Sequence, residues 1–268
     1  MSFGLFLLVA NPAVTSASVS YQYEEYRALI GRQAVEARRL KMKTPQIGIV
    51  SHHLPTASPL IDDFYRHLKK ARPDIGTFIV VGPDHFEKCR HKFSVSGQSV
   101  STMFGEIKND SNIFSQLSIA GAKKEDACFQ GEHAIGVQAN YIRKYFPEAR
   151  IVPLLLSYLA QSRNFDKTIA VLKKNRKNTF VLASLDFTHY IDARAANIND
   201  EVSHKLLLSQ DGPAFTLKQV DSPGTLRLVL RLARELKLNT EILDHKNSFD
   251  YNGSFQNTTS YFSVLFGK

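Results

Sequence analysis

The chain has 268 residues, of which 43% are hydrophobic and 22% are charged, as in ordinary globular proteins. This length can bury a large core without disulfide or metal support, and no collagen-like, coiled-coil or low-complexity pattern is present. The formal charge of +9 permits nucleic acid or an anionic surface as a partner. However, the basic clusters are dispersed over predicted helix ends, and no zinc-finger or RNA-binding motif occurs, so nucleic acid is not the partner that we expect.

The first 40 residues differ in character from the rest of the chain. Residues 3–10 are apolar (FGLFLLVA), but they are too short to span a bilayer and lack the preceding Lys or Arg of a secretory signal. A packed N-terminal segment in a cytoplasmic protein is favoured, and an export signal stays open. Residues 20–42 show helical periodicity. We therefore expect an N-terminal segment and helix at 1–40, followed by one domain at 41–268.

Beyond residue 41, short apolar runs alternate with amphipathic stretches. We expect strands at 47–50, 77–82, 93–96, 149–157, 179–184, 240–243 and 260–267. Pro153 inside one of these strands suggests a sheet edge or a bulge. We expect helices at 58–71, 111–120, 133–145, 162–174, 196–208 and 225–238. Apolar strands that alternate with helices predict a single-domain, three-layer α/β/α fold with a mostly parallel or mixed central sheet.

Histidines follow three of the predicted buried strands. His52 and His53 come after the strand IGIV, His85 after TFIVVG, and His189 after TFVLAS. In open α/β sheets, ligands bind beyond the carboxyl ends of the strands, so these side chains are expected at one edge. Imidazole is a common metal ligand and the usual acid or base near neutral pH. Each histidine alone could instead cap a backbone group, but their convergence predicts a functional site.

Six stretches of the chain occur in a characteristic order: IGIVSHH, FIVVGPDH, GEHAIGVQ, ARIVPLLLS, LASLDFTHY and DSPGTLRLVLRLA. They resemble the family of Memo-like proteins, which is called AmmeMemoRadiSam system protein B in bacteria and archaea. That family is related in structure to class III extradiol ring-cleaving dioxygenases. The resemblance extends over about residues 45–265, and its combination of GPxH, EHxI and SxDFxH is specific. It implies a Memo-like domain with an extradiol-dioxygenase-like fold at 41–268.

The resemblance also implies metal ligands. His52 and His85 match two ligand positions of the family, and Asp221 matches a third, which is a cysteine in animal members. A thiolate favours copper(I) or zinc, whereas two histidines and a carboxylate suit iron(II) or manganese. We therefore expect a divalent metal, with Fe(II) favoured and Cu, Zn or Mn as further candidates. Asp221 could instead cap the helix that follows it, and both interpretations are kept.

Further residues match pocket positions of the family. Asp186 and His189 belong to the DFxH stretch, and the related dioxygenases use a non-ligand histidine there as acid or base. The resemblance thus implies proton transfer by His189, orientation of a ligand histidine by Asp186, and a pocket-lining or catalytic place for His133 beside Glu132. The role of His53 is left open.

The two cysteines, Cys89 and Cys128, do not form a CxxC pair, and they are too few for a disulfide framework. We expect free thiols, although one bridge would fit an exported protein. Cys89 lies on the loop after His85 and is a candidate redox-sensitive thiol. Cys128 reads as a small buried apolar side chain or as part of the rim of the site.

The leading hypothesis is a Memo-like metal-binding protein with a His/His/Asp pocket for a small molecule or peptide. A non-haem iron-dependent dioxygenase, an oxidoreductase, is the alternative. A basic nucleic-acid-associated or scaffold protein with an inert pocket is the third hypothesis. No segment approaches transmembrane length, and the oligomeric state is unknown.

Overall fold

The computed structural model describes residues 18–21, 40–158, 160, 165–253 and 255–268. The apolar stretch at 3–10 and most of the helix expected at 20–42 lie outside these residues. Residues 20 and 21 belong to strand β1 (Ser18–Tyr21), so the expected helix is wrong at that point. No helix among the described residues is long and apolar enough to cross a membrane.

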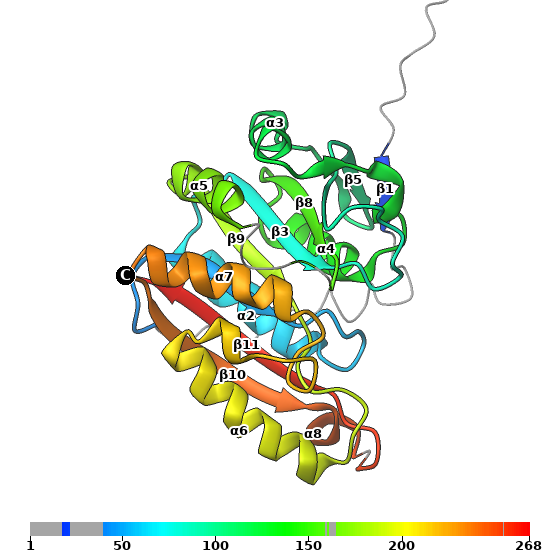
Figure 1. Cartoon of the computed structure of the whole chain (residues 1–268), viewed down its shortest axis with the longest axis vertical. Helices are drawn as coiled ribbons and strands as arrows, with labels where there is room; N and C mark the ends of the chain where they lie inside the picture. The colour runs from blue at the N-terminus through cyan, green and yellow to red at the C-terminus, as the bar shows by residue number, and fades with distance from the viewer. Residues whose placement is uncertain (1–17, 22–39, 159, 161–164, 254) are drawn as a thin grey trace, which may run out of the picture.

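A mixed sheet of eight strands forms the middle layer of the domain (Figure 1). Its order is β10-β11-β2-β9-β3-β8-β4-β7, and the central strands β2, β9, β3 and β8 run parallel. Their bounds are β2 (Pro45–Val50), β3 (Thr77–Pro83), β4 (Phe93–Val95), β7 (Lys123–Lys124), β8 (Arg150–Leu156), β9 (Thr179–Ser184), β10 (Asn239–Asn247) and β11 (Ser260–Gly267). A smaller sheet joins β1 to β5 (Ser99–Thr102) and β6 (Gly105–Ile107).

Helices cover both faces of the large sheet. Helices α2 (Ser58–Ala71) and α4 (His133–Tyr145) pack on one face, where Phe78 and Val80 are buried. The other face buries Ile79 and Val81 against α3 (Ser111–Ile119), α5 (Asp166–Asn175), α6 (Ala193–Ser209) and α7 (Pro223–Glu235). Each such side chain contributes about 1.5–3 kcal/mol on burial. Both faces of β3 are therefore apolar, and the expected three-layer α/β/α fold with a mixed sheet is confirmed.

Pro153 lies in an interior strand, so the expectation of a sheet edge is wrong. Strand β8 lies between β3 and β4, but β4 ends opposite Leu154. The Ile151 amide donates to the Lys108 carbonyl on the side away from β3, and Pro153 faces the same side, two residues later. On that side the Pro153 carbonyl accepts from the amide of Ser96, the residue after β4, at 3.2 Å, so the proline omits only the return hydrogen bond at the end of the ladder.

Capping explains the shifted helix boundaries. Asp192 accepts from the Ala195 amide at 3.0 Å, so α6 begins three residues earlier than expected. Ser222 caps α7 through the Thr225 amide, with Pro223 in the first turn. Strands β4 to β7 lack strong sequence periodicity and are held by strand pairing. Helix α8 (Ser248–Asn252) begins with a capping box between Asn247 and Asp250.

Candidate metal centre

The carboxyl ends of three neighbouring parallel strands carry the candidate residues. His52 and His53 follow β2, His85 follows β3, and Asp186 follows β9, which lies between β2 and β3. Because these strands are parallel, their ends meet at one edge of the sheet. The prediction that the sheet brings these side chains to one edge is confirmed.

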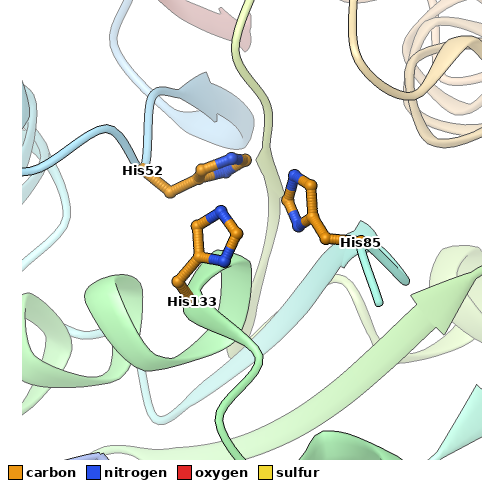
Figure 2. Close-up of side chains that lie close together, drawn as sticks. All are labelled: His52, His85 and His133. Carbon is orange, nitrogen blue, oxygen red and sulfur yellow. The ribbon is translucent and has the colours of Figure 1, made fainter. Parts of the chain in front are cut away.

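Three imidazole rings converge above this edge (Figure 2). The ring centroids of His52 and His85 are 4.9 Å apart, those of His52 and His133 also 4.9 Å, and those of His85 and His133 4.1 Å. One nitrogen from each ring lies within 4.8 Å of one nitrogen from each of the others. His133 comes from the first turn of α4 rather than from a strand end, so sequence reasoning placed it in the pocket but missed it as a member of the group that could hold a metal ion.

Asp221 brings a carboxylate to the same point. Its Oδ2 lies 3.4 Å from His52 Nε2 and 3.7 Å from His85 Nε2. Both separations exceed ordinary hydrogen-bond lengths. Two ligand atoms about 2.1 Å from a shared ion lie roughly 3.0 to 3.4 Å apart for right-angle or tetrahedral geometry, so each of these two pairs could share an ion after small shifts. At this site, the described groups whose ligand atoms all lie within 4.8 Å of one another are His52, His85 and His133, and His52, Asp186 and Asp221, so Asp221 meets the two imidazoles pairwise.

The backbone holds this carboxylate in place. The Asp221 amide donates to the Asp186 carbonyl, and the Asp186 amide donates back to Asp221 Oδ2, both at 3.0 Å. The N-cap of α7 is Ser222, so the alternative in which Asp221 caps the helix is wrong. Asp221 Oδ1 is buried and has no hydrogen-bond partner in the described structure. A buried carboxylate oxygen without a donor is costly, and an ion in the pocket would satisfy it.

Asp186 is buried against His52. Its Oδ1 accepts from the Ser51 hydroxyl and, at 3.2 Å, from the His52 amide, while its Oδ2 lies 3.4 Å from His52 Nε2. Burial alone would raise the pKa of Asp186, but the imidazoles of His52 and His189 outweigh it and hold that pKa below its usual value. His52 Nδ1 contacts the Ser184 hydroxyl at 3.2 Å, so its Nε2 faces the carboxylates.

Glu132 anchors the second imidazole. Its fully buried carboxylate contacts His85 Nδ1 at 2.7 Å, accepts from the His85 amide at 2.9 Å and caps α4 through the Ala134 amide at 3.0 Å. Burial lowers the pKa of His85, but the carboxylates of Asp221 and Glu132 raise it to about 10. The sequence placed Glu132 only as the neighbour of His133, and this orienting contact was missed because it depends on how the His85 loop meets α4.

The remaining pocket histidines differ in environment. Burial and the neighbouring His52 and His85 lower the pKa of His133 to about 4, so its ring is neutral at pH 7. His53 Nδ1 contacts the Tyr261 hydroxyl at 2.7 Å, and burial lowers the pKa of His53. His189 is half-buried, and its ring lies 5.3 Å from that of Tyr190.

A cavity of about 580 Å³ adjoins the cluster. Among the described residues, five of the chain's nine histidines line it. The lining consists of His52, His53, Leu54, His85, His133, Val137, Asp186, His189, Tyr190 and Asp221. All of the site residues expected from the sequence therefore line one cavity, which is large enough for a small molecule beside the candidate ligands.

The two cysteines form a disulfide with a Cα–Cα distance of 5.1 Å, so the expectation of free thiols is wrong. Cys89 lies on the loop after His85, and Cys128 lies in the 3-10 helix η2 (Asp126–Phe129), before Glu132. The pairing of β4 with β7 brings these distant segments together, which the sequence spacing alone does not reveal.

Known proteins resemble the chain in sequence and fold. The family model described as Memo-like protein matches residues 14–265. A MEMO1 family protein of Pyrobaculum aerophilum is 28% identical over 207 residues, which cover 73% of each chain. Another, from Thermoplasma volcanium, is 22% identical over 267 residues, which cover 96% of this chain and 98% of the relative. The crystal structure of an uncharacterized protein from Escherichia coli K12 shares the fold, with a TM-score of 0.54, 14% identity, and coverage of 84% of this chain and 100% of that chain.

Proposed function

The chain belongs to the Memo-like protein family, and from this premise we propose that it binds a divalent metal ion through His52, His85 and Asp221. The observation that carries the proposal is the position of Asp221. Its Oδ2 lies at ligand-like separations of 3.4 and 3.7 Å from the two imidazoles, while its buried Oδ1 has no partner among the described residues. Both features fit a cation in the pocket.

The donor set also favours a particular kind of ion. Two imidazoles and one carboxylate, with an open cavity beside them, suit iron(II), with manganese, zinc and copper as further candidates. When bound, such an ion would act as a Lewis acid on an oxygen-bearing ligand. Glu132 would hold the His85 ring in the ligand orientation through the Nδ1 contact, and Ser184 would do the same for His52.

His133 competes with Asp221 for the third ligand position. Its neutral imidazole lies within the same 4.8 Å cluster as those of His52 and His85. We assign the position to Asp221, because its Oδ2 faces Nε2 of both His52 and His85 and its buried carboxylate has an oxygen without a donor, which a bound cation would help to compensate. The aromatic stack between His133 and His85 gives His133 a separate role in fixing the ligand ring.

The test is metal analysis of the purified chain with variants of each candidate ligand. The wild type should bind a single equivalent of iron(II), while His85→Ala and Asp221→Ala should lose it and His133→Ala should retain it. His204→Ala, an exposed histidine outside the cavity, is the matched control. Unchanged affinity in Asp221→Ala, or loss in His133→Ala alone, would transfer the third position to His133.

A second candidate function, a dioxygenase-like oxidoreductase, rests on the cavity of about 580 Å³ and on His189. That side chain lines the cavity but belongs to none of the groups of described residues that could share an ion. It would be free to hold or move a proton on a bound substrate. Oxygen uptake by the iron-loaded chain with a panel of catechols tests this function, and absence of uptake would leave metal binding without ring cleavage.

A further inference from the structure

A second group of metal-ligating side chains surrounds the disulfide. One carboxylate oxygen of Glu125 and the sulfur atoms of Cys89 and Cys128 all lie within 4.8 Å of one another. The imidazole of His91 lies beside this group, with its Nδ1 3.1 Å from Glu125 Oε2. None of these four side chains lines the cavity of the metal centre, and the proposed function does not use them.

We propose that reduction of the Cys89–Cys128 disulfide opens a second metal site, which binds zinc through both thiolates, Glu125 and His91. Two thiolates, an imidazole and a carboxylate are all ligand types that zinc accepts in tetrahedral sites. Thiolates favour zinc over hard ions such as magnesium or manganese. In the oxidised chain the two sulfur atoms are bonded to each other, so the site exists only after reduction.

The spacing of the two non-sulfur groups already suits such a site. Two nitrogen or oxygen ligands about 2.0 Å from a tetrahedral zinc ion lie roughly 3.3 Å apart. The observed separation of 3.1 Å between His91 Nδ1 and Glu125 Oε2 is close to this value. The ligands come from two short segments, Cys89-x-His91 and Glu125-x-x-Cys128, each of which supplies two.

The fold keeps these segments together without the disulfide. Strand β4 begins two residues after His91, strand β7 ends immediately before Glu125, and the two strands pair in parallel. The Glu125 amide donates to the Val95 carbonyl at 3.3 Å. Its carboxylate accepts from the amides of Arg90 and His91 at 3.2 and 3.1 Å. Reduction therefore frees the sulfur atoms while the backbone keeps the Glu125 carboxylate beside them, and the exposed His91 ring would turn toward the sulfur atoms to complete the site.

Charge and exposure fit entry of a cation from solvent. Cys128 is buried, whereas the His91 side chain is 49% exposed, so the ion would enter from the imidazole side. Two thiolates and a carboxylate would carry three negative charges, and a zinc ion would leave one. The exposed Arg90 guanidinium, whose Nε lies 3.1 Å from Glu125 Oε1, would offset that remaining charge.

The chemistry of opening is a thiol–disulfide exchange. A cellular dithiol supplies two electrons and two protons, the Cys89–Cys128 bond breaks to give two thiols, and the reductant becomes a disulfide. Zinc binding then displaces the two thiol protons. In a reducing compartment the site would be available, and in an oxidising one it would be closed.

The test uses the full chain carrying both His52→Ala and His85→Ala. This double replacement removes the proposed first site, so any metal bound reports on the second site alone. The reduced protein, titrated with cobalt(II) without oxygen, should show a thiolate-to-cobalt charge-transfer band that zinc displaces at one equivalent. The oxidised protein should show none. Cys128→Ser should abolish the band, and His91→Ala should weaken binding at least about tenfold, because even outer partners of ligands contribute that much. His204→Ala should change nothing.

Two outcomes would overturn the inference. One is a reduced chain that gives no thiolate–cobalt band, and the other is a band that persists in Cys128→Ser. Should Cys128→Ser fail to fold, alkylation of the reduced thiols in the already folded chain provides the same comparison, and binding that survives alkylation would equally refute the site. Iron binding by the otherwise unmodified chain reports on the first site independently.

Discussion

Replacement of Glu132 by alanine probes how the proposed metal centre is built. The change removes one fully buried carboxylate that caps α4 and accepts from the amide of His85 while contacting its ring. Loss of the cap costs about 1 kcal/mol. The unsatisfied His85 amide costs about 1–3 kcal/mol more. We therefore expect the free energy of unfolding of the metal-free chain to fall by about 2–4 kcal/mol in urea denaturation.

The same replacement should weaken metal binding separately. Carboxylates that orient a ligand histidine typically contribute 10- to 100-fold in affinity, or about 1.4–2.8 kcal/mol. Glu132→Gln keeps an oxygen for the cap but loses the charge that faces His85. Its free energy of unfolding should fall by about 1 kcal/mol, and its metal affinity should fall about tenfold. Competition with a chelator of known affinity measures both variants.

Asp110→Ala is the matched control. Asp110 caps α3 through the Ile113 amide and accepts from the Thr77 hydroxyl, at the opposite edge of the sheet. It should lower stability to a similar extent and leave metal affinity unchanged. If Glu132→Ala also left the affinity within about twofold, well under the expected 10- to 100-fold loss, the carboxylate would be a cap alone and the orienting role would be refuted.

Three further predictions concern Asp221 and His189 in the pocket and Glu125 near the disulfide. Asp221→Cys should still bind a metal but prefer zinc or copper over iron(II) in competition assays, and an unchanged preference would contradict the ligand assignment. His189→Ala should leave metal affinity unchanged while removing any catechol-dependent oxygen uptake, and a loss of metal would instead make His189 a ligand. Burial opposes ionisation of Glu125, but donors from Ser94, Arg90 and His91 lower its pKa to about 2. The ionised Glu125 side chain therefore stabilises the fold fully above its ordinary pKa of 4.5, and this stabilisation is lost as the pH falls toward 2. The difference in free energy of unfolding between the wild type and Glu125→Gln should shrink over that pH range. A difference that does not change with pH would contradict this.

The central strands were predictable because they are buried on both faces. Runs such as TFIVVG and TFVLAS have no polar alternation, and the structure buries every residue of the corresponding strands. Strand β10 is longer than expected. Its sequence NTEILDHKN is polar and pairs on one side only, with β11, so it lacks the apolar pattern that reveals a buried strand. Pro153 could not be placed from the sequence, because β4 ends beside it and the extent of β4 is a tertiary feature.

The candidate site was predictable where topology alone determines position. His52 and His85 end parallel strands separated only by β9, so the strand order brings them together. Asp221 was ambiguous, because the choice between helix cap and pocket carboxylate depends on its reciprocal backbone contacts with Asp186. The Cys89–Cys128 bond depends likewise on the long-range pairing of β4 with β7. Neither contact can be inferred from the spacing of the residues in the sequence.

The most direct test of the account is an anomalous difference map from crystals of the iron(II)-loaded chain. We expect one strong peak about 2.0–2.3 Å from Nε2 of His52, Nε2 of His85 and a carboxylate oxygen of Asp221. A peak bound by other residues, or no peak in crystals of protein that carries iron in solution, would contradict it.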